Sequence, residues 1–184
     1  MDADLKSITH ILNNDVSGLK ELMKRYKDAV YRMAYHYMGN TEDAAEITED
    51  VFFRVYKKSS SYKAKASVKI WIFTIAANLC KDALRRRKKH QRVSYLPEDE
   101  SMDSFASGAD TPAEEQSRKE MAEEIEQAIQ ELPHKLRFPF VFCILEENSY
   151  RECAYVLGCS EKTIETRIYR ARLQLRESLS KVIA

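Results

Sequence analysis

Residues 149–175, SYRECAYVLGCSEKTIETRIYRARLQL, contain two short helical patterns joined by a turn. Ser149 and Glu152 have the spacing of a capping box, which satisfies free backbone amides at the start of a helix. Gly158 stands where that helix should end, because glycine adopts the left-handed conformation of a helix C-terminus without strain. Ser160 can then cap the next helix. This spacing predicts a helix-turn-helix.

The second of these helices has one apolar and one basic face. Apolar residues recur along it at steps of four and three, which predicts a buried stripe made of Ile164, Ile168, Ala171, Leu175, Leu179 and Val182. The opposite face carries Lys162, Glu165, Thr166, Arg167, Arg170 and Arg172. A helix-turn-helix with a basic second helix is typical of proteins that read the major groove of DNA. A solvated helical hairpin is the alternative on these residues alone.

The rest of the chain also has helical periodicity. Its 184 residues include only four glycines and four prolines, and apolar residues recur at three and four in almost every segment. We expect one helix from an N-cap at Ser17 to Gly39, a second capped by Thr41, and a third over residues 67–89, with Trp71, Ile72, Ile75, Leu79 and Ala83 facing inward. The predicted fold class is therefore all-α, and these helices can close one N-terminal bundle.

A change in composition separates two helical units. Residues 93–113 are acidic, contain prolines and a glycine, and offer few apolar side chains. Such a composition is typical of a flexible linker. We expect the N-terminal bundle at residues 1–92, the linker at 93–113, and a C-terminal helical unit with the helix-turn-helix at 114–184. In that second unit, Pro139 lies inside an apolar helical pattern and should kink or split the helix.

Charge, cysteines and hydropathy exclude several classes of protein. The formal net charge is +1, so any contact with nucleic acid must come from local segregation of charge. The four cysteines, Cys80, Cys143, Cys153 and Cys159, have no C-x-x-C spacing, which argues against a zinc site and a secreted disulfide framework. The start MDADLKS is no signal peptide, and no apolar run could span a membrane. We expect a cytoplasmic protein with no cofactor, no metal and no membrane insertion.

An enzyme is the distant alternative. The one E-x-x-H, Glu131 to His134, contains Pro133, and no second copy completes a carboxylate and histidine metal site. The other histidines, His10, His36 and His90, are isolated in the sequence. We therefore expect no enzymatic activity.

The N-terminal unit carries basic residues beside aromatic ones. Arg85-Arg86-Arg87-Lys88-Lys89 ends the third helix, where the helix dipole alone would also favour cations. The loop before that helix is basic and offers Tyr62, with Trp71 shortly after it. Basic residues interleaved with aromatic ones suit stacking on unpaired bases, although Trp71 also suits a core position. Two basic surfaces separated by an acidic segment indicate contact with nucleic acid at two places.

The order of these segments resembles a known family. The segments are NTEDAAEITEDVFFRVYK (40–57), WIFTIAANLCKDALRRRKK (71–89), AIQELPHKLRFPFVF (128–142) and NSYRECAYVLGCSEKTIETRIYRARLQLRESL (148–179). Together they resemble the extracytoplasmic-function sigma factors, the minimal bacterial form of the sigma-70 family. The resemblance covers nearly the whole chain. It implies sigma region 2 in the bundle, sigma region 4 in the C-terminal unit, and a subunit that gives core RNA polymerase its promoter specificity.

The resemblance also implies three sets of contact residues. Core polymerase would bind the helix with Asp43, Glu46, Glu49, Asp50 and Phe53, for which a solvated acidic face is the alternative. The minus-ten element would meet Tyr62, Lys63, Lys65, Trp71, Asn78, Lys81, Arg85, Arg86 and Lys88. The minus-thirty-five element would meet Lys162, Thr163, Glu165, Thr166 and Arg167, with Arg170 and Arg172 on phosphates.

The implied partners are bacterial core RNA polymerase, promoter DNA and an anti-sigma factor. The chain departs from the family pattern at Val68 and Ile70, where phenylalanine and threonine are usual, and at Glu49 and Glu165, where glutamine and lysine are more common. The nearest alternative is a stand-alone, dimeric helix-turn-helix regulator. Such a regulator should bind its operator without polymerase, whereas a sigma factor should need the core enzyme.

Overall fold

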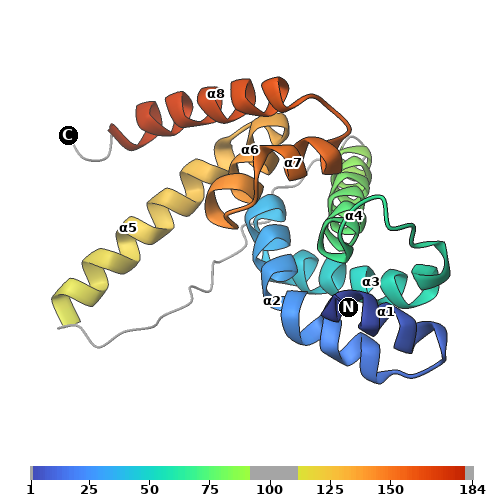
Figure 1. The fold of residues 1–184 in the computed structure, drawn as a ribbon. Helices are drawn as coiled ribbons and strands as arrows, with labels where there is room; N and C mark the ends of the chain where they lie inside the picture. Colours follow the sequence, from blue (N-terminus) through green and yellow to red (C-terminus); the bar gives the residue numbers. More distant parts are fainter. Residues whose placement is uncertain (1, 92–111, 181–184) are drawn as a thin grey trace.

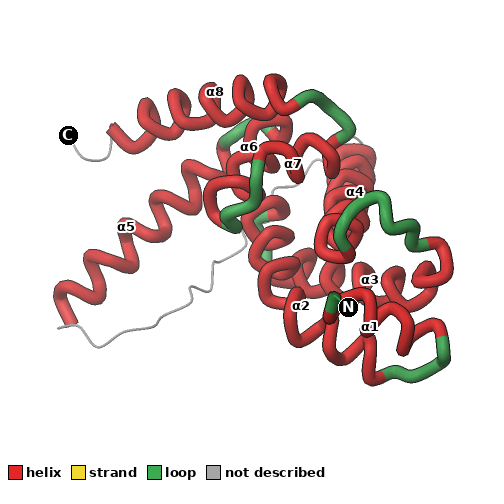
Figure 2. Tube along the Cα trace, viewed as in Figure 1, coloured by secondary structure: helices red, strands yellow, loops and turns green. Residues whose placement is uncertain are grey.

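The computed structural model describes residues 2–91 and 112–180, and this part of the chain is helical with no strand (Figures 1 and 2). The first unit holds α1 (Ala3–Leu12), α2 (Ser17–Met38), α3 (Thr41–Lys58), a 3-10 turn (Ser59–Ser61) and α4 (Val68–Gln91). The second holds α5 (Pro112–Glu131), α6 (His134–Phe140), a π-helical turn η2 (Val141–Leu145), α7 (Tyr150–Leu157) and α8 (Glu161–Ser180). The all-α prediction is confirmed. Most of the predicted linker lies outside the described residues.

Helix α2 is the central element of the first unit, since it packs on α1, α3 and α4. It ends as predicted at Gly39, whose φ of +85° is the left-handed conformation. Two predicted N-caps are wrong. Asp15, not Ser17, accepts the free amide at the start of α2, with Oδ1 2.9 Å from Ser17 N. Asn40, not Thr41, caps α3, because its Oδ1 accepts from Asp43 N at 2.7 Å.

Helix α1 is held on α2 by a buried carboxylate, a contact that was not predicted from the sequence. Asp4 is 8% exposed and contacts both the Arg25 guanidinium and the Tyr26 hydroxyl. Burial and the bond to Asp4 raise the pKa of Tyr26, so the phenol stays protonated and donates. Arg25 Nη2 also donates to Ser7 Oγ at 2.8 Å. The carboxylate is thus paired and hydrogen-bonded, as burial requires.

Helix α6 is interrupted at the predicted proline. Pro139 lacks the amide hydrogen that a continuing α-helix needs, and α6 ends at Phe140. The chain then widens into the π-helical turn, in which Glu146 N donates to Val141 O at 3.0 Å. The predicted split is confirmed. The turn carries Val141 and Phe142 into the core.

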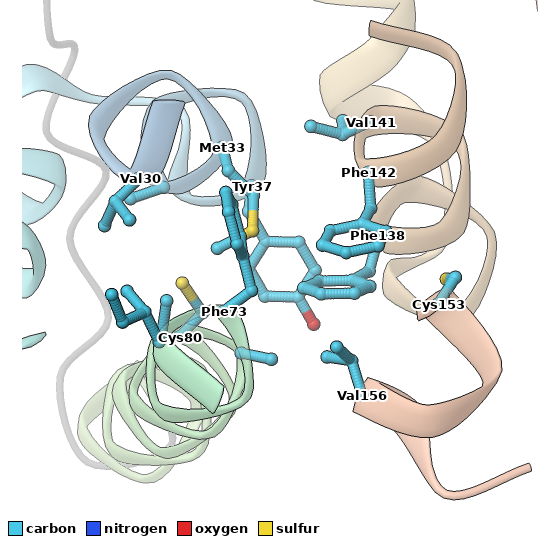
Figure 3. Packing of buried hydrophobic residues seen from close by; sticks show 14 of the residues in the cluster. Val30, Met33, Tyr37, Phe73, Cys80, Phe138, Val141, Phe142, Cys153 and Val156 are labelled. Carbon is cyan, nitrogen blue, oxygen red and sulfur yellow. The ribbon is translucent and has the colours of Figure 1, made fainter. Parts of the chain in front are cut away.

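The two units share one hydrophobic core, which the sequence did not predict. Figure 3 shows Met33 and Tyr37 of α2 and Phe73 of α4 facing Phe138 and Phe142 of the second unit. The ring centroids of Phe73 and Phe142 lie 5.3 Å apart, and those of Tyr37 and Phe138 lie 5.6 Å apart. The contact joins segments that lie far apart in the sequence.

This shared core changes the face that α4 buries. Ile72 and Leu79 are buried as predicted, but Trp71, Ile75 and Ala83 are only partly buried. Six other side chains of α4 are also buried: Val68, Ile70, Phe73, Ala76, Ala77 and Cys80. The prediction treated α4 as covered from one side, whereas α2, α3 and the second unit cover it from several.

Candidate nucleic-acid and polymerase interface

The helix-turn-helix forms through the predicted local interactions. Ser149 N donates to Glu152 Oε2 at 2.9 Å, and Glu152 N donates to Ser149 Oγ at 3.2 Å, so the capping box is complete. Gly158 has a φ of +64°, and an added Cβ would meet no atom within 4 Å, so its requirement is conformational rather than steric. Ser160 Oγ accepts from Thr163 N at 3.2 Å and starts α8. These predictions are confirmed.

Helix α8 separates its apolar and basic residues as predicted. The buried stripe contains Ile164, Ile168, Ala171 and Leu175, Leu179 is partly buried, and Val182 lies outside the described residues. On the opposite side Lys162, Glu165, Thr166, Arg170 and Arg172 are exposed, while Thr163 and Arg167 are partly covered. The candidate minus-thirty-five residues therefore lie on a rigid helix whose other face is fixed in the core.

The carboxylate of Glu165 is paired within this face. Lys162 Nζ lies 2.8 Å from Glu165 Oε2, and both side chains are largely exposed. Thr166 Oγ1 bonds back to the Lys162 carbonyl at 2.9 Å, so its methyl group and hydroxyl are fixed in orientation. An exposed ion pair of this kind contributes little to stability and can open to meet a ligand.

A hollow of about 530 Å³ lies on this side of α8, lined by Tyr150, Lys162, Glu165, Thr166, Ile168, Tyr169 and Arg172. Tyr169 is 63% exposed and was not among the predicted residues. The sequence could have indicated Tyr169 through its spacing, because it lies four residues after Glu165 and three before Arg172 and so shares their side of the helix.

In the first unit, Tyr62 and Trp71 form an aromatic pair at the loop before α4. Their ring centroids lie 5.2 Å apart, and Tyr62 Oη donates to the Ala66 carbonyl at 2.7 Å. Both rings are partly buried, so Trp71 is neither a core residue nor a free ligand. Lys63 and Lys65 are exposed on the loop that this pair supports. The structure thus brings the predicted aromatic and basic residues together.

The remaining candidate minus-ten residues follow α4. Asn78, Arg85 and Arg86 are exposed, Lys81 is partly exposed, and the side chain of Lys88 lies outside the described part. The spacing of Trp71, Asn78 and Arg85 is seven residues, so their side chains leave the helix on nearly the same side. A strand that lay along this side would meet the aromatic pair first and the arginines last.

The acidic side of α3 carries an exposed aromatic residue. Phe53 is 60% exposed, and Lys57 Nζ lies 5.7 Å from the centre of its ring. Glu46 and Glu49 are exposed, whereas Asp43 and Asp50 are partly covered. Asp43 Oδ2 also lies 3.8 Å from Arg87 Nη1 of α4. A large exposed apolar side chain among carboxylates favours a protein contact over a simply solvated face.

A second hollow lies where the loop before α4 meets the first helix of the helix-turn-helix. This hollow of about 580 Å³ lies between the loop before α4 and helix α7, and its lining includes Lys65, Ser67, Ile70, Arg151, Tyr155 and Cys159. Tyr155 is 53% exposed there and was not predicted. The first turn of α4 and the helix-turn-helix are therefore direct neighbours.

Three of the four cysteines are buried in this arrangement. All four are free, and Cys80, Cys143 and Cys153 are buried. Burial raises the pKa of Cys80 to about 12. The hydrogen bond with Cys143, together with burial, raises the pKa of Cys153. Protonated, buried thiols are poor nucleophiles and poor metal ligands.

Within residues 2–91 and 112–180, no cluster of three histidine, cysteine or acidic side chains is placed to hold a metal ion. In the same residues, none of the helices combines the length and the apolar character needed to cross a membrane.

Family models and similar proteins all point to sigma factors. The family model for sigma-70 region 2 matches residues 22–90, and that for sigma-70 region 4 matches residues 122–175. The ECF RNA polymerase sigma factor SigE of Mycolicibacterium smegmatis is 34% identical over 161 residues, which cover 88% of this chain and 61% of SigE. SigW of Bacillus subtilis is 28% identical over 179 residues, 95% of each protein.

Two solved structures share the fold. The sigma factor RpoE from Bartonella quintana, in complex with the anti-sigma factor NepR, has a TM-score of 0.73 at 21% identity, over 88% of this chain and 96% of RpoE. CnrH, in complex with the cytosolic domain of CnrY, has a TM-score of 0.73 at 21% identity, over 98% of this chain and 99% of CnrH.

Proposed function

Because this chain belongs to the extracytoplasmic-function sigma factors of the sigma-70 family, we propose that it directs bacterial core RNA polymerase to specific promoters and initiates transcription there. The observation that carries this function is the presence of three different surfaces on one chain: the acidic side of α3, the aromatic and basic side of α4, and the basic side of α8. A stand-alone regulator needs only the third. The protein acts by binding alone, in the cytoplasm, where polymerase works.

Core polymerase is the proposed partner of α3. Its contact would involve Asp43, Glu46, Glu49, Asp50 and Phe53. Phe53 supplies apolar area that gains by burial, and the carboxylates around it select a basic partner surface. The two assigned units, residues 1–92 and 114–184, are joined by residues 93–113 and then carry different binding surfaces of the protein.

The unpaired strand of the minus-ten element is the proposed ligand of α4 and its preceding loop. Extruding a base from the duplex costs a few kcal/mol, and stacking on an aromatic ring offsets about 1–3 kcal/mol of that cost. Trp71 and Tyr62 supply the rings, and Asn78 supplies both a hydrogen-bond donor and an acceptor. Phosphates would be met by Lys63, Lys65, Lys81, Arg85, Arg86 and Lys88.

The duplex of the minus-thirty-five element is the proposed ligand of α8. Lys162, Thr163, Glu165, Thr166 and Arg167 would reach base edges, while Arg170 and Arg172 would contact phosphates. The structural neighbour RpoE is bound to the anti-sigma factor NepR. We propose that an anti-sigma factor binds the present chain as well.

Reconstitution of initiation tests this function. The full chain is added to core polymerase with a promoter library, and RNA products are sequenced. We expect promoter-specific products only when both proteins are present. Phe53→Ala should weaken binding to core about tenfold or more, whereas Leu12→Ala, which truncates another exposed apolar side chain on α1, should not. Specific binding of a DNA site by the chain alone, without any effect of core polymerase, would support the dimeric regulator instead.

A further inference from the structure

Helix α1 has no part in the proposed contacts with polymerase or promoter. None of the residues assigned to those contacts lies on it, and it precedes residue 22, where the match to sigma-70 region 2 begins. The helix nevertheless packs on α2, on the 3-10 turn Ser59–Ser61 and on α4. The turn and α4 enclose the loop that carries the candidate minus-ten residues. The position of α1 therefore bears on the minus-ten surface.

A buried carboxylate determines how α1 lies on α2. Asp4 and Ser7 of α1 are only 8% and 5% exposed. The Arg25 guanidinium donates to Oδ1 of Asp4, and the Tyr26 hydroxyl donates to Oδ2. Arg25 Nη2 also donates to Ser7 Oγ at 2.8 Å. Because α2 bonds both carboxylate oxygens, moving the first turn of α1 would leave a buried charge without its partners, which is costly.

A glycine brings the same two helices into close contact. A Cβ on Gly18 of α2 would lie 2.2 Å from the Ser7 carbonyl oxygen and 2.9 Å from His10 Cβ. Both separations are shorter than van der Waals contact, so a larger residue at position 18 must push α1 away from α2. Gly18 and Asp4 thus fix one helix through two different contacts, one steric and one electrostatic.

The start of α1 lies beside the minus-ten loop. Burial raises the pKa of Tyr62, and the charges of Asp2 and Asp4 raise it further, so these carboxylates are close to the phenol. The 3-10 turn holds the same residue, since the buried Ser59 accepts from Tyr62 N through its carbonyl at 3.1 Å. The rings of Tyr62 and Trp71 are in contact, with 5.2 Å between their centroids. A series of contacts thus leads from α1 to both aromatic rings.

We propose that Asp4 is a positioning residue for promoter opening: it fixes α1 against the 3-10 turn, and α1 holds the Tyr62 and Trp71 rings in the arrangement that receives an unpaired base. This role rests on the proposed function, because it reaches DNA only through the minus-ten surface. A loop that is already ordered loses less conformational entropy on binding, so its ligand binds more tightly. Asp4 itself touches no nucleic acid. Its loss should therefore weaken opening without weakening the contacts of α3 and α8.

The fluorescence of Trp71 reports the loop directly, because the chain has one tryptophan. Acrylamide quenching is measured in the full chain for Asp4→Asn and Gly18→Ala, which disturb α1 through different contacts. The controls are Lys6→Ala, an exposed change on α1, and Val51→Ala, a buried truncation on α3. We expect stronger quenching in both α1 variants than in the wild type, and wild-type quenching in both controls.

Promoter opening by the holoenzyme is the second measurement, followed by a fluorescent base analogue in the minus-ten strand. Opening should fall about tenfold in Asp4→Asn and in Gly18→Ala, because a displaced supporting element misplaces the rings. Binding to core polymerase and to a minus-thirty-five duplex should stay at the wild-type level. Tyr26→Phe removes one bond to Asp4. Combined with Asp4→Asn, it should lower opening by less than the two separate effects together, since both changes break one network.

Wild-type quenching in both α1 variants would overturn the proposal, and so would a fall in opening that Val51→Ala reproduces, because α1 would then only stabilise the fold. Increased quenching with opening at the wild-type rate would overturn it as well. If Asp4→Asn does not fold, Gly18→Ala and Tyr26→Phe decide between these results. A wild-type holoenzyme that opens no promoter would instead overturn the proposed function, while quenching of Trp71 in the free chain would still show whether α1 holds the loop.

Discussion

The surfaces on α8 and on α4 are both basic, but they are built differently. On α8 the polar side chains stand on a straight helix fixed by four buried residues behind it, and Lys162 and Glu165 pair with each other. On α4 the surface begins at a loop that Tyr62 supports through one hydrogen bond and one ring contact with Trp71. A rigid helix suits the fixed spacing of a duplex groove, whereas an aromatic pair suits bases that have left their stack.

The largest effect is expected for a substitution on α4 that removes an aromatic ring. Trp71→Ala removes a ring worth about 1–3 kcal/mol of stacking, so promoter opening should fall about tenfold to a hundredfold, with duplex binding changed much less. Asn78→Ala should act in the same direction with a smaller effect. Stopped-flow fluorescence of a base analogue in the minus-ten strand measures opening, and a filter assay on duplex measures binding.

Tyr62→Phe is the matched control, because it keeps the ring beside Trp71 and removes only the bond to the Ala66 carbonyl. If Trp71→Ala lowers duplex binding and opening equally, the tryptophan supports the loop rather than the unpaired base.

The next largest effect is expected on α8, from a substitution of Glu165 that changes base preference. A carboxylate in the major groove can accept a hydrogen bond from cytosine and disfavours other bases by roughly 1–3 kcal/mol. Glu165→Lys should therefore relax or change the preference at one minus-thirty-five position and raise non-specific affinity. It also replaces the ion pair with Lys162 by two like charges. Holoenzyme binding to a minus-thirty-five library measures this preference.

Glu161→Lys gives the same change of charge at another exposed residue in the first turn of α8. It should raise affinity for all sequences without changing the preferred base. An unchanged preference in Glu165→Lys would show that Glu165 is only an exposed helix residue.

These two surfaces also differ in how far the sequence could predict them. The helix-turn-helix follows from interactions within a few residues, namely the capping box of Ser149 and Glu152 and the left-handed turn at Gly158. The buried side chains of α8 are then the apolar residues that recur at steps of four and three. On α4, Phe73 is buried because Phe142 of the second unit packs against it. The spacing of apolar residues along α4 alone cannot predict such a contact.

The contact of α5 and α6 with the C-terminal end of α2 could not be predicted, for the same physical reason. Gln130 and Arg137 meet carbonyls that lie 94 and 100 residues earlier in the chain. Each of them reads in the sequence as an ordinary polar residue of an amphipathic helix. Backbone carbonyls at a helix end carry no signal of which side chain will satisfy them. The roles assigned to individual DNA and polymerase contacts, and the domain limits, stay predictions.

A third, smaller effect separates base contacts from phosphate contacts on α8. Arg170→Ala and Arg172→Ala should each weaken binding to all sequences alike and lower the slope of log K against log salt by about one. Titrations at two salt concentrations on a preferred and a scrambled duplex measure both quantities. Arg151→Ala on α7, also exposed, serves as the control for the loss of one positive charge. A change of base preference in either α8 variant would move that arginine from the phosphates to the base edges.

A last and smaller effect is expected from the acid dependence of the contact between α5 and the end of α2, where His36 Nδ1 lies 2.6 Å from Glu126 Oε2. Burial raises the pKa of Glu126, but the hydrogen bond and charge of His36 and the bond from Gln130 outweigh burial, so its pKa lies below the ordinary value of 4.5. A carboxyl whose pKa is lowered on folding stabilises the folded state fully above its unfolded pKa and loses this contribution as the pH falls through the folded value. Glu126→Gln should therefore reduce Tm at pH 7 by on the order of a few degrees, with a difference that shrinks below about pH 4.5.

Thermal melts from pH 7 to pH 3 measure this difference in Tm, with Glu124→Gln, an exposed change on the same helix, as the control. A difference between Glu126→Gln and wild type that stays constant down to pH 3 would mean that the carboxylate charge contributes nothing to the contact, and that hydrogen bonds alone hold α5 against the end of α2.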